Sequence, residues 1–168
     1  GGAWVRKVGA HVFDGENAER LEHAIATGSY EKPDDMGWFP TPSTVVEKLL
    51  NLAGDLSGRL VLEPSGGEGR IAMAARARGA QVRAVELHPG RAATLAGLLG
   101  AENVIEGDFL AVEPFPVDVV IANPPFARRA DVKHLMHALR FVKPGGRLVS
   151  VMSASIGFRQ DNLTTELR

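Results

Sequence analysis

The chain has 168 residues, a formal net charge of −1 and no cysteine. This length is enough for one domain with a sizeable core, whereas disulfide bonds and thiolate metal sites are excluded. The near-neutral charge argues against a protein dedicated to tight binding of duplex DNA, because such proteins are usually basic. No apolar run is long enough to span a membrane and nothing resembles a signal peptide, so we expect a cytoplasmic protein without a membrane partner.

The first part of the chain carries few signals of regular structure. Residues 1–36 are polar and mixed, and we expect them to form an N-terminal arm or helical extension. Within them, residues 17–27 have apolar side chains at helical spacing. Residues 30–41 are rich in proline, glycine and aspartate, which predicts a loop. Ser43 is then expected to cap a helix that ends near Ala53.

From residue 59 onward, short apolar strands alternate with helix-forming segments. The predicted strands are residues 59–64, 81–87, 103–108, 117–124 and 147–155. The predicted helices between them are residues 70–78, 89–99 and 131–141, the last ended by the sequence KPGG. This alternation predicts an α/β fold with a doubly wound, mostly parallel sheet. Ligands bind such sheets outside the carboxyl ends of the strands.

A glycine-rich turn follows the first of these strands, and an acidic residue ends the second. The turn, EPSGGEG, runs from Glu63 to Gly69. Glycines there let a ligand approach the backbone closely and let the next helix pack tightly on the strand. Glu86 ends the second strand 19 positions after Gly67, where a carboxylate is well placed to hold the hydroxyl groups of a ribose.

Two kinds of nucleotide cofactor fit such a turn. Residues 67–72 match the G-x-G-x-x-A form of the dinucleotide fingerprint, which is weak on its own. A dinucleotide would bring its pyrophosphate against Glu63 and Glu68, and these carboxylates would repel it. S-adenosylmethionine carries a sulfonium and an ammonium group, which nearby carboxylates favour. The turn therefore favours S-adenosylmethionine, and glycines that only form a tight turn are the simpler alternative.

A stiff loop with the sequence NPPF follows the fourth predicted strand. Pro124 and Pro125 prevent strand pairing and helix formation at that point, and Pro124 also holds Asn123 extended. The loop therefore presents the Asn123 amide, backbone carbonyl groups and the aromatic ring of Phe126.

This set of groups suits methylation of an amide-like nitrogen such as adenine N6. The lone pair of that nitrogen is delocalised, and two acceptors on its N–H bonds would draw it towards tetrahedral geometry. We expect the side-chain oxygen of Asn123 and the carbonyl of Pro124 to be these acceptors, and Phe126 to stack on the target. Catalysis would consist of positioning and electrostatics, and a base in a duplex would first be flipped out. The alternative is a rigid loop with its phenylalanine in the core.

The segments LEPSGGEG, AVELHP, EGDFL and ANPPF, in this order at strand ends, resemble the class I S-adenosylmethionine-dependent methyltransferases. The NPPF segment resembles the branch that methylates amino nitrogens, which includes N6-adenine DNA methyltransferases of bacteria, phages and plasmids. The upstream segment FPTP, residues 39–42, resembles the additional cofactor-binding motif of adenine enzymes in which that motif comes first. The likeness covers roughly residues 37–168, the expected methyltransferase domain, and implies S-adenosylmethionine as cofactor and DNA as partner.

The resemblance also implies roles for individual residues. The residues that would line the turn and the methionine part of the cofactor are Glu63, Ser65, Gly67 and Gly69. Those that would hold its ribose and adenine are Glu86, Leu87, Asp108 and Phe109. Those that would close over its methionine end are Phe39, Thr41 and Pro42. The target nitrogen would be handled by Asn123, Pro124, Pro125 and Phe126.

In this family the sheet continues after the fifth strand with a helix and an antiparallel pair of strands. The chain ends at Arg168, so we expect these carboxyl-terminal strands to be absent or truncated. We also expect no separate target-recognition domain.

Alternative assignments stay open. His134 and His137 could share a helix face as metal ligands, but no third ligand is apparent, so we expect no metal site. Glutamine in a protein or an amino group in RNA could accept the methyl group instead of DNA; the charge favours these, and FPTP favours adenine in DNA. A catalytically idle fold that serves as an interaction module is another alternative, and a nicotinamide-dependent oxidoreductase is a distant one. The pattern predicts no oligomeric state.

Overall fold

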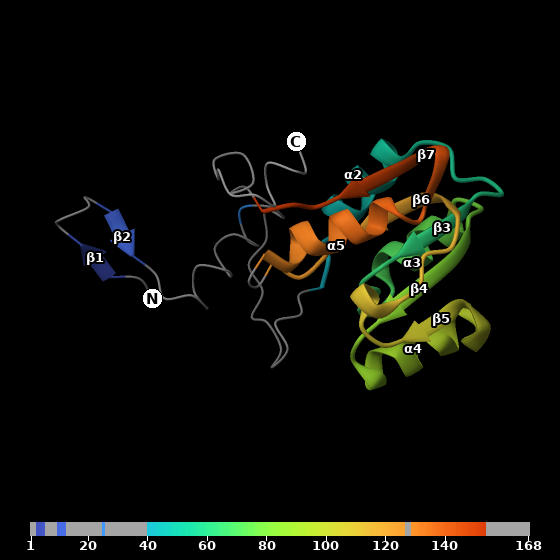
Figure 1. Cartoon of the computed structure of the whole chain (residues 1–168), viewed down its shortest axis with the longest axis horizontal. Coiled ribbons are helices and arrows are strands. Elements are labelled where there is room, and N and C mark those ends of the chain that lie inside the picture. Colours follow the sequence, from blue (N-terminus) through green and yellow to red (C-terminus); the bar gives the residue numbers. More distant parts are fainter. Residues whose placement is uncertain (1–2, 6–9, 13–24, 26–39, 127–128, 154–168) are drawn as a thin grey trace.

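The computed structural model describes residues 3–5, 10–12, 25, 40–126 and 129–153. Its main element is a five-stranded sheet in the order β5-β4-β3-β6-β7, in which every neighbouring pair is parallel (Figure 1). The strands are β3 (Leu60–Glu63), β4 (Gln81–Glu86), β5 (Val104–Glu106), β6 (Val117–Ala122) and β7 (Val142–Ser150). The predicted doubly wound parallel sheet is confirmed, and the order of strands reverses at β3 and β6.

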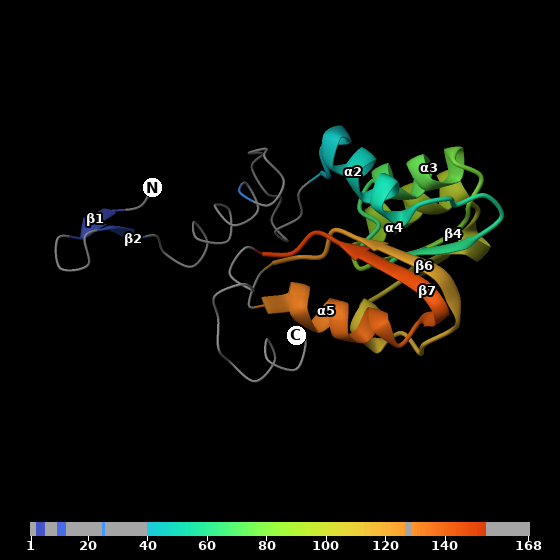
Figure 2. The ribbon, with the colours of Figure 1, turned by 90° about the horizontal axis from the view of Figure 1, so that it is seen from above.

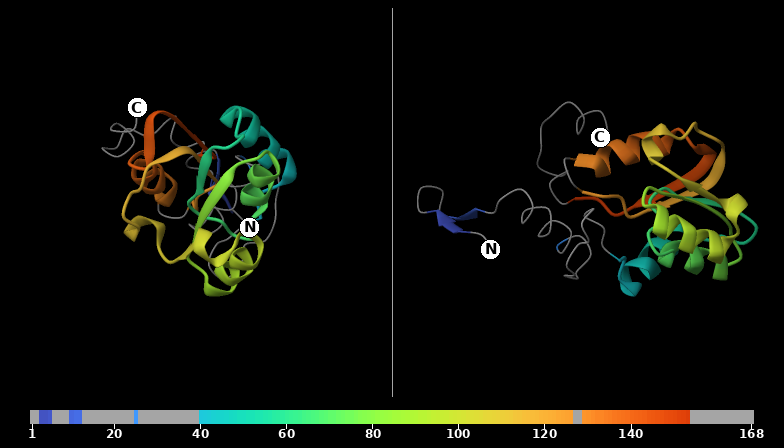
Figure 3. Two further views of the ribbon diagram at one scale, coloured as in Figure 1. Left: turned by 90° about the vertical axis from the view of Figure 1, so that its right-hand side faces the viewer. Right: turned by 90° about the horizontal axis from the view of Figure 1, so that it is seen from below.

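Helices cover both faces of this sheet. They are α2 (Ser43–Ala53), α3 (Arg70–Ala77), α4 (Pro89–Leu99) and α5 (Ala130–Leu139). Figures 2 and 3 show α2, α3 and α4 on one face and α5 on the other. Two short 3-10 turns, η1 (Ala101–Asn103) and η2 (Phe109–Ala111), flank β5. Because all the strands run the same way, the turns that follow them gather at one edge of the sheet.

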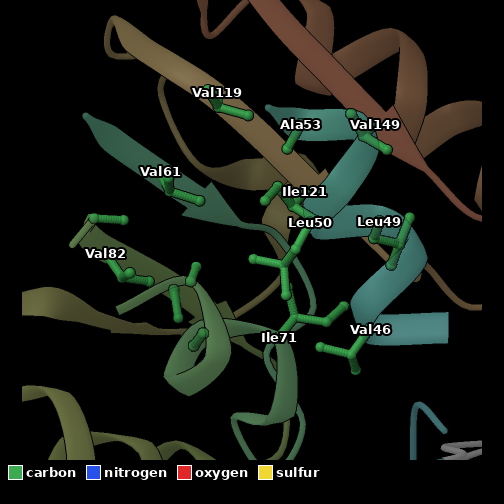
Figure 4. Packing of buried hydrophobic residues seen from close by; sticks show 14 of the residues in the cluster. Val46, Leu49, Leu50, Ala53, Val61, Ile71, Val82, Val119, Ile121 and Val149 are labelled. Carbon is green, nitrogen blue, oxygen red and sulfur yellow. The ribbon is translucent and has the colours of Figure 1, made fainter. Parts of the chain in front are cut away.

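The core lies on both faces because successive residues of a strand point to opposite sides. Val61 of β3 packs with Leu50 and Ile71 in the cluster under α2 and α3 (Figure 4). Its neighbour Leu62 belongs to a second cluster on the other face, which also holds Phe141. Burial on both faces explains the nearly unbroken apolar strands of the sequence.

Two predicted boundaries differ from the structure. Ser43 was expected to cap helix α2, but it is the first residue of the helix and its side chain makes no capping bond. Pro42 occupies the cap position, and its carbonyl accepts hydrogen bonds from the N–H groups of Val45 and Val46 at 2.9 and 3.0 Å. Strand β7 begins at Val142 and so includes the KPGG segment, which was predicted to precede the strand.

Glycine explains why KPGG can remain in the strand. Gly145 has a φ of 78°, and a Cβ on Gly146 would lie 2.7 Å from the carbonyl oxygen of Asp118. Small residues therefore let β7 stay close to β6 through the irregular register near Val117. The Asp118 carboxylate accepts from the Leu60 N–H and from Lys143, at 2.8 and 3.0 Å, and these two bonds hold its pKa below the ordinary value.

Some predicted segments lie outside the described residues. These are most of the expected helix at residues 17–27, residues 30–39, and residues 154–168, where the carboxyl-terminal strands were expected to be missing. In the N-terminal arm, β1 (Ala3–Val5) and β2 (Ala10–Val12) form an antiparallel pair that the sequence did not predict. None of the described helices combines the length and apolar character needed to cross a bilayer.

The glycine-rich turn packs against α4 without room for a side chain at Gly66. A Cβ there would lie 2.6 Å from Leu95 Cδ1 and 3.4 Å from the Ala84 Cβ. Leu95 is fully buried, so it has little freedom to move aside. The absence of a side chain at Gly66 thus sets how closely the turn approaches α4.

Gly66→Ala is therefore expected to destabilise the fold by about 1–3 kcal/mol, as overpacking of a core does. Gly97→Ala is the matched control, since Gly97 lies in the same helix as Leu95 and has open space around it; it should stabilise the protein by up to about 1 kcal/mol through helix propensity. Urea unfolding followed by circular dichroism measures both. A Gly66→Ala variant as stable as the wild type would contradict this account of the packing.

Candidate active site

Two buried carboxylates hold the glycine-rich turn in place. The N–H of Gly67 donates to Glu86 Oε2 at 2.7 Å, and the N–H of Ala72 donates to Glu63 Oε2 at 2.7 Å. Glu63 is only 2% exposed and Glu86 only 5%. Ala72 lies in the first turn of α3, where helix N–H groups have no partner within the helix. Glu63 thus caps α3 across the turn, and Glu86 fixes the turn to the end of β4.

Several backbone donors of the turn bond within the protein and are not available to an anion. Besides Gly67 and Ala72, the N–H of Gly66 donates to the Val85 carbonyl at 2.9 Å, and that of Gly69 to the Gly66 carbonyl at 2.8 Å. A phosphate site at a helix N-terminus needs such N–H groups to be free. The arrangement therefore presents negative charge where a phosphate cradle would present positive charge.

The pKa of Glu63 reflects this environment. Burial raises the pKa of the Glu63 carboxyl well above its ordinary value; the Ala72 N–H opposes the rise, and the Glu86 carboxylate adds to it. A cation that approached the turn would favour the ionised form of Glu63.

Glu86 has structural contacts that the sequence did not predict. Its Oε1 accepts from the His88 N–H at 2.8 Å and from Arg91 Nε at 3.1 Å, in addition to the Gly67 bond on Oε2. The expected contact with ribose hydroxyl groups stays a prediction. It would use acceptor capacity that remains on Oε2, since a carboxylate oxygen can accept more than one hydrogen bond.

Of the three residues expected around the adenine of the cofactor, two are exposed and one is buried. Leu87 is 55% exposed directly after β4, and the Asp108 side chain is exposed after β5, where its Oδ1 caps η2 through the Leu110 N–H at 2.9 Å. Phe109 is 2% exposed, and its ring centroid lies 5.3 Å from that of Phe141. The structure therefore leaves Leu87 and Asp108 accessible to a ligand and places the Phe109 ring in the core.

His134 of α5 reaches the same edge of the sheet, which the sequence did not predict. Its Nδ1 lies 3.5 Å from Ser65 Oγ, and its ring packs at 5.5 Å from Phe109. Burial lowers the pKa of His134, the Asp108 carboxylate opposes this and His137 adds to it, so the imidazole is mainly neutral at neutral pH. Ser65 and His134 are 69 positions apart, so no local sequence pattern could have predicted their contact.

His137, the other member of the suggested metal pair, has a different partner. Its Nε2 lies 3.0 Å from the Val112 carbonyl oxygen. Across the described part of the chain, no group of three or more histidine, aspartate or glutamate side chains could hold a metal ion.

The Asn123 amide is the most unusual group of the site. Its Nδ2 donates to Thr41 Oγ1 at 3.0 Å. Its Oδ1 is buried and is the one buried side-chain polar atom among the described residues that has no hydrogen-bond partner. Leaving such an acceptor unpaired costs about 1–3 kcal/mol. An amide oxygen kept in this state right after β6 is therefore a candidate to accept a hydrogen bond from a ligand.

The rest of the NPPF loop is only partly open. Pro124 is buried and Pro125 exposed. Phe126 is 8% exposed and belongs to the core cluster under α2 and α3. Its position matches the alternative in which the phenylalanine closes the core, and a stacking role stays a prediction.

The upstream FPTP segment also reaches this edge, as far as it is described. Phe39 lies outside the described residues. Thr41 is 9% exposed, and its carbonyl accepts from Arg70 Nη1 at 3.2 Å. Pro42 caps α2. Thr41 thus lies between the start of α3 and the NPPF loop, and the expected cofactor contacts of this segment stay predictions.

Comparison with known proteins places this geometry among methyltransferases. No family model matches the chain. A curated relative from Methanospirillum hungatei, provisionally assigned as ribosomal RNA small subunit methyltransferase A, is 33% identical over 95 residues, which are 53% of this chain. The chain spans only 37% of the length of that relative.

Solved structures give a broader match. A protein from Pyrococcus horikoshii, provisionally assigned as an RNA methyltransferase, is 28% identical with a TM-score of 0.57 over 73% of this chain and 70% of that one. An RNA methyltransferase from Salinibacter ruber, in complex with S-adenosyl-L-homocysteine, is 26% identical with a TM-score of 0.54 over 67% and 76%. The M protein of the type I restriction enzyme EcoKI reaches a TM-score of 0.66 at 16% identity, over 80% and 37%.

These matches agree with the parallel sheet and flanking helices of the structure. The chain therefore has the Rossmann-like fold of the class I methyltransferases.

Proposed function

We propose that the chain is an S-adenosylmethionine-dependent methyltransferase that methylates an exocyclic amino nitrogen of a nucleobase, adenine N6 in DNA. The observation that carries the proposal is the buried, unpaired Oδ1 of Asn123 directly after β6. An acceptor of this kind suits an amino group whose N–H bonds need a partner.

The chemistry of the turn supports this cofactor. The N–H groups of Gly66, Gly67 and Gly69 bond within the protein, and the acidic side chains of Glu63 and Glu86 are buried beside the turn. This environment disfavours the pyrophosphate of a dinucleotide and favours the ammonium and sulfonium groups of S-adenosylmethionine. The Salinibacter ruber neighbour, which holds S-adenosyl-L-homocysteine, supports the same cofactor.

In the proposed reaction the chain positions the target nitrogen. Asn123 Oδ1 and the Pro124 carbonyl accept hydrogen bonds from its two N–H groups. These bonds draw the nitrogen towards tetrahedral geometry, so that its lone pair becomes available for attack. Bound S-adenosylmethionine would supply a methyl carbon open to attack by this nitrogen, with the sulfur leaving as a thioether that keeps the electron pair, and the nitrogen would give one proton to water. The rate enhancement comes from orientation and from acceptors fixed in advance.

RNA is a second candidate substrate, because three of the similar proteins are assigned as RNA methyltransferases. The neighbours from Pyrococcus horikoshii and Salinibacter ruber and the curated relative are all assigned to RNA. The upstream FPTP segment favours adenine in DNA, through its resemblance to adenine enzymes. Both substrates require the same acceptors at Asn123 and Pro124.

The direct test supplies labelled methyl groups to separate pools of substrate. The full chain is incubated with methyl-tritiated S-adenosylmethionine and duplex DNA, single-stranded DNA, RNA or protein, and the products are hydrolysed and separated. We expect labelled N6-methyladenine from DNA. Labelled amino bases from RNA alone would replace the DNA assignment, and labelled glutamine would replace the nucleic-acid one. Binding of the cofactor without label in any pool would contradict methyltransferase activity.

Asn123→Ala should lower kcat by about 100-fold or more, the usual effect of removing a group that acts in the transition state. Affinity for S-adenosyl-L-homocysteine, measured by calorimetry, should stay close to that of the wild type. Asn51→Ala is the control, because Asn51 is exposed in α2. A normal kcat in Asn123→Ala would show that another group is the acceptor.

Glu63→Gln separates the two effects of the buried carboxyl. Because the folded-state pKa is raised, Glu63 contributes stability below its unfolded-state pKa and loses that contribution as pH rises through the folded-state pKa. The glutamine variant does not ionise, so it should become more stable than the wild type as pH rises. It should also bind S-adenosylmethionine about tenfold more weakly at the upper end of that range, since a charged contact is worth about 1.5 kcal/mol or more.

Urea unfolding and calorimetry measure both quantities, from the ordinary carboxyl pKa of about 4.3 up to about pH 8. Glu47→Gln, at an exposed position, is the control. A gain in stability without loss of cofactor affinity would limit Glu63 to its structural role.

A further inference from the structure

One hydrogen bond joins the segment before α2 to the loop after β6. Asn123 Nδ2 donates to Thr41 Oγ1 at 3.0 Å, across 82 positions of sequence. The two residues lie at the carboxyl edge of the sheet, one directly after β6 and one just before the first turn of α2. The other end of the amide, Oδ1, is buried and has no hydrogen-bond partner among the described residues.

In the structure, this bond uses the donor end of the amide and leaves the acceptor end to a ligand. A side-chain amide has a donor end and an acceptor end, and fixing one end fixes the other. With Nδ2 bound to Thr41, the acceptor is left for the target. If the amide were turned over, its NH2 group would face the N–H groups of the target amine. Two donors would then meet and no hydrogen bond could form.

Thr41 is itself held firmly enough to act as a reference point. Its carbonyl accepts from Arg70 Nη1 at 3.2 Å. The next residue, Pro42, accepts the N–H groups of Val45 and Val46 at the start of α2. Thr41 is only 9% exposed. The position of its hydroxyl group is therefore set by α2 and α3 together.

We propose that Thr41 is a positioning residue, which holds the Asn123 amide with its oxygen towards the target amino group. This inference rests on the proposed function, and for the Thr41 side chain it replaces the cofactor contact that the resemblance implies with a role in turnover. Specificity for an amine follows from it, because only the acceptor end of the amide remains available.

The test compares three variants of the full chain. Thr41→Val has nearly the same shape but no acceptor, Thr41→Ser keeps the hydroxyl group, and Thr44→Val is the control at an exposed threonine of α2. Turnover is measured with tritiated S-adenosylmethionine and the DNA or RNA pool that the wild type methylates. Cofactor affinity is measured with S-adenosyl-L-homocysteine by calorimetry.

We expect Thr41→Val to lower kcat by about tenfold, the effect of one ordinary hydrogen bond on a barrier, with unchanged affinity for S-adenosyl-L-homocysteine. Thr41→Ser should recover most of the loss, and Thr44→Val should behave as the wild type. In an Asn123→Ala background, Thr41→Val should have no further effect on kcat, because Thr41 acts through Asn123. A residue with only a structural role would lower kcat in both backgrounds.

An NMR measurement checks the hydrogen bond without any turnover. The side-chain N–H signals of Asn123 should exchange slowly with solvent in the wild type and in Thr41→Ser, and rapidly in Thr41→Val.

Each contrary outcome has a distinct meaning. If the wild type transfers methyl groups and Thr41→Val has an unchanged kcat, the inference is overturned and the proposed function stands. If Thr41→Val loses cofactor affinity at unchanged kcat, Thr41 is a cofactor residue and the inference is again overturned. If the wild type methylates no pool, the proposed function fails, and the inference fails with it.

Discussion

The geometry of the site depends on two buried carboxylates at the ends of neighbouring strands. Glu63 caps α3 through the Ala72 N–H, and Glu86 holds Gly67. Because β3 and β4 pair in parallel, the two acids reach opposite ends of one short turn. The turn is thereby fixed to the sheet and to α3 before any ligand binds. The N–H groups of Gly66, Gly67 and Gly69 bond within the protein, so they are not available to a phosphate, and the two acidic side chains disfavour it further.

Much of this arrangement could be predicted from the sequence, because local patterns carry it. Apolar runs that end in Glu63, Glu86 and Asn123 predict buried strands, and parallel strands bring their ends to one edge. The parallel sheet and its alternation with helices are confirmed. The boundary of β7 was wrong because KPGG was interpreted only as a helix stop, whereas Gly146 lets the strand approach the Asp118 carbonyl.

The side-chain contacts at the site could not be predicted, because they join residues far apart in sequence. The bond of Thr41 to Asn123 spans 82 positions, and the contact of Ser65 with His134 spans 69. Such pairs depend on helix packing and rotamers, which no short motif encodes. Burial was equally hidden: Phe126 and Phe109 occupy motif positions, yet their rings pack in the core. A motif fixes where a residue stands in the chain, and packing then decides which of its atoms a ligand can reach.

Two buried polar groups that destabilise the fold, the Glu63 carboxyl and Asn123 Oδ1, lie at the same edge of the sheet. The Glu63 carboxyl is desolvated, and Asn123 Oδ1 has no partner. Glutamine at the first position and an apolar side chain at the second would each remove a cost, since buried charges and unpaired acceptors destabilise a fold. Asn123 Oδ1 is the one buried side-chain polar atom of the described residues without a partner, and Glu63 is buried but hydrogen-bonded. Because these two groups lie at the ends of β3 and β6, between which the strand order reverses, a ligand that pairs with both would relieve both costs on binding. A cation beside Glu63 and an amine on Asn123 are the chemical partners that would do so.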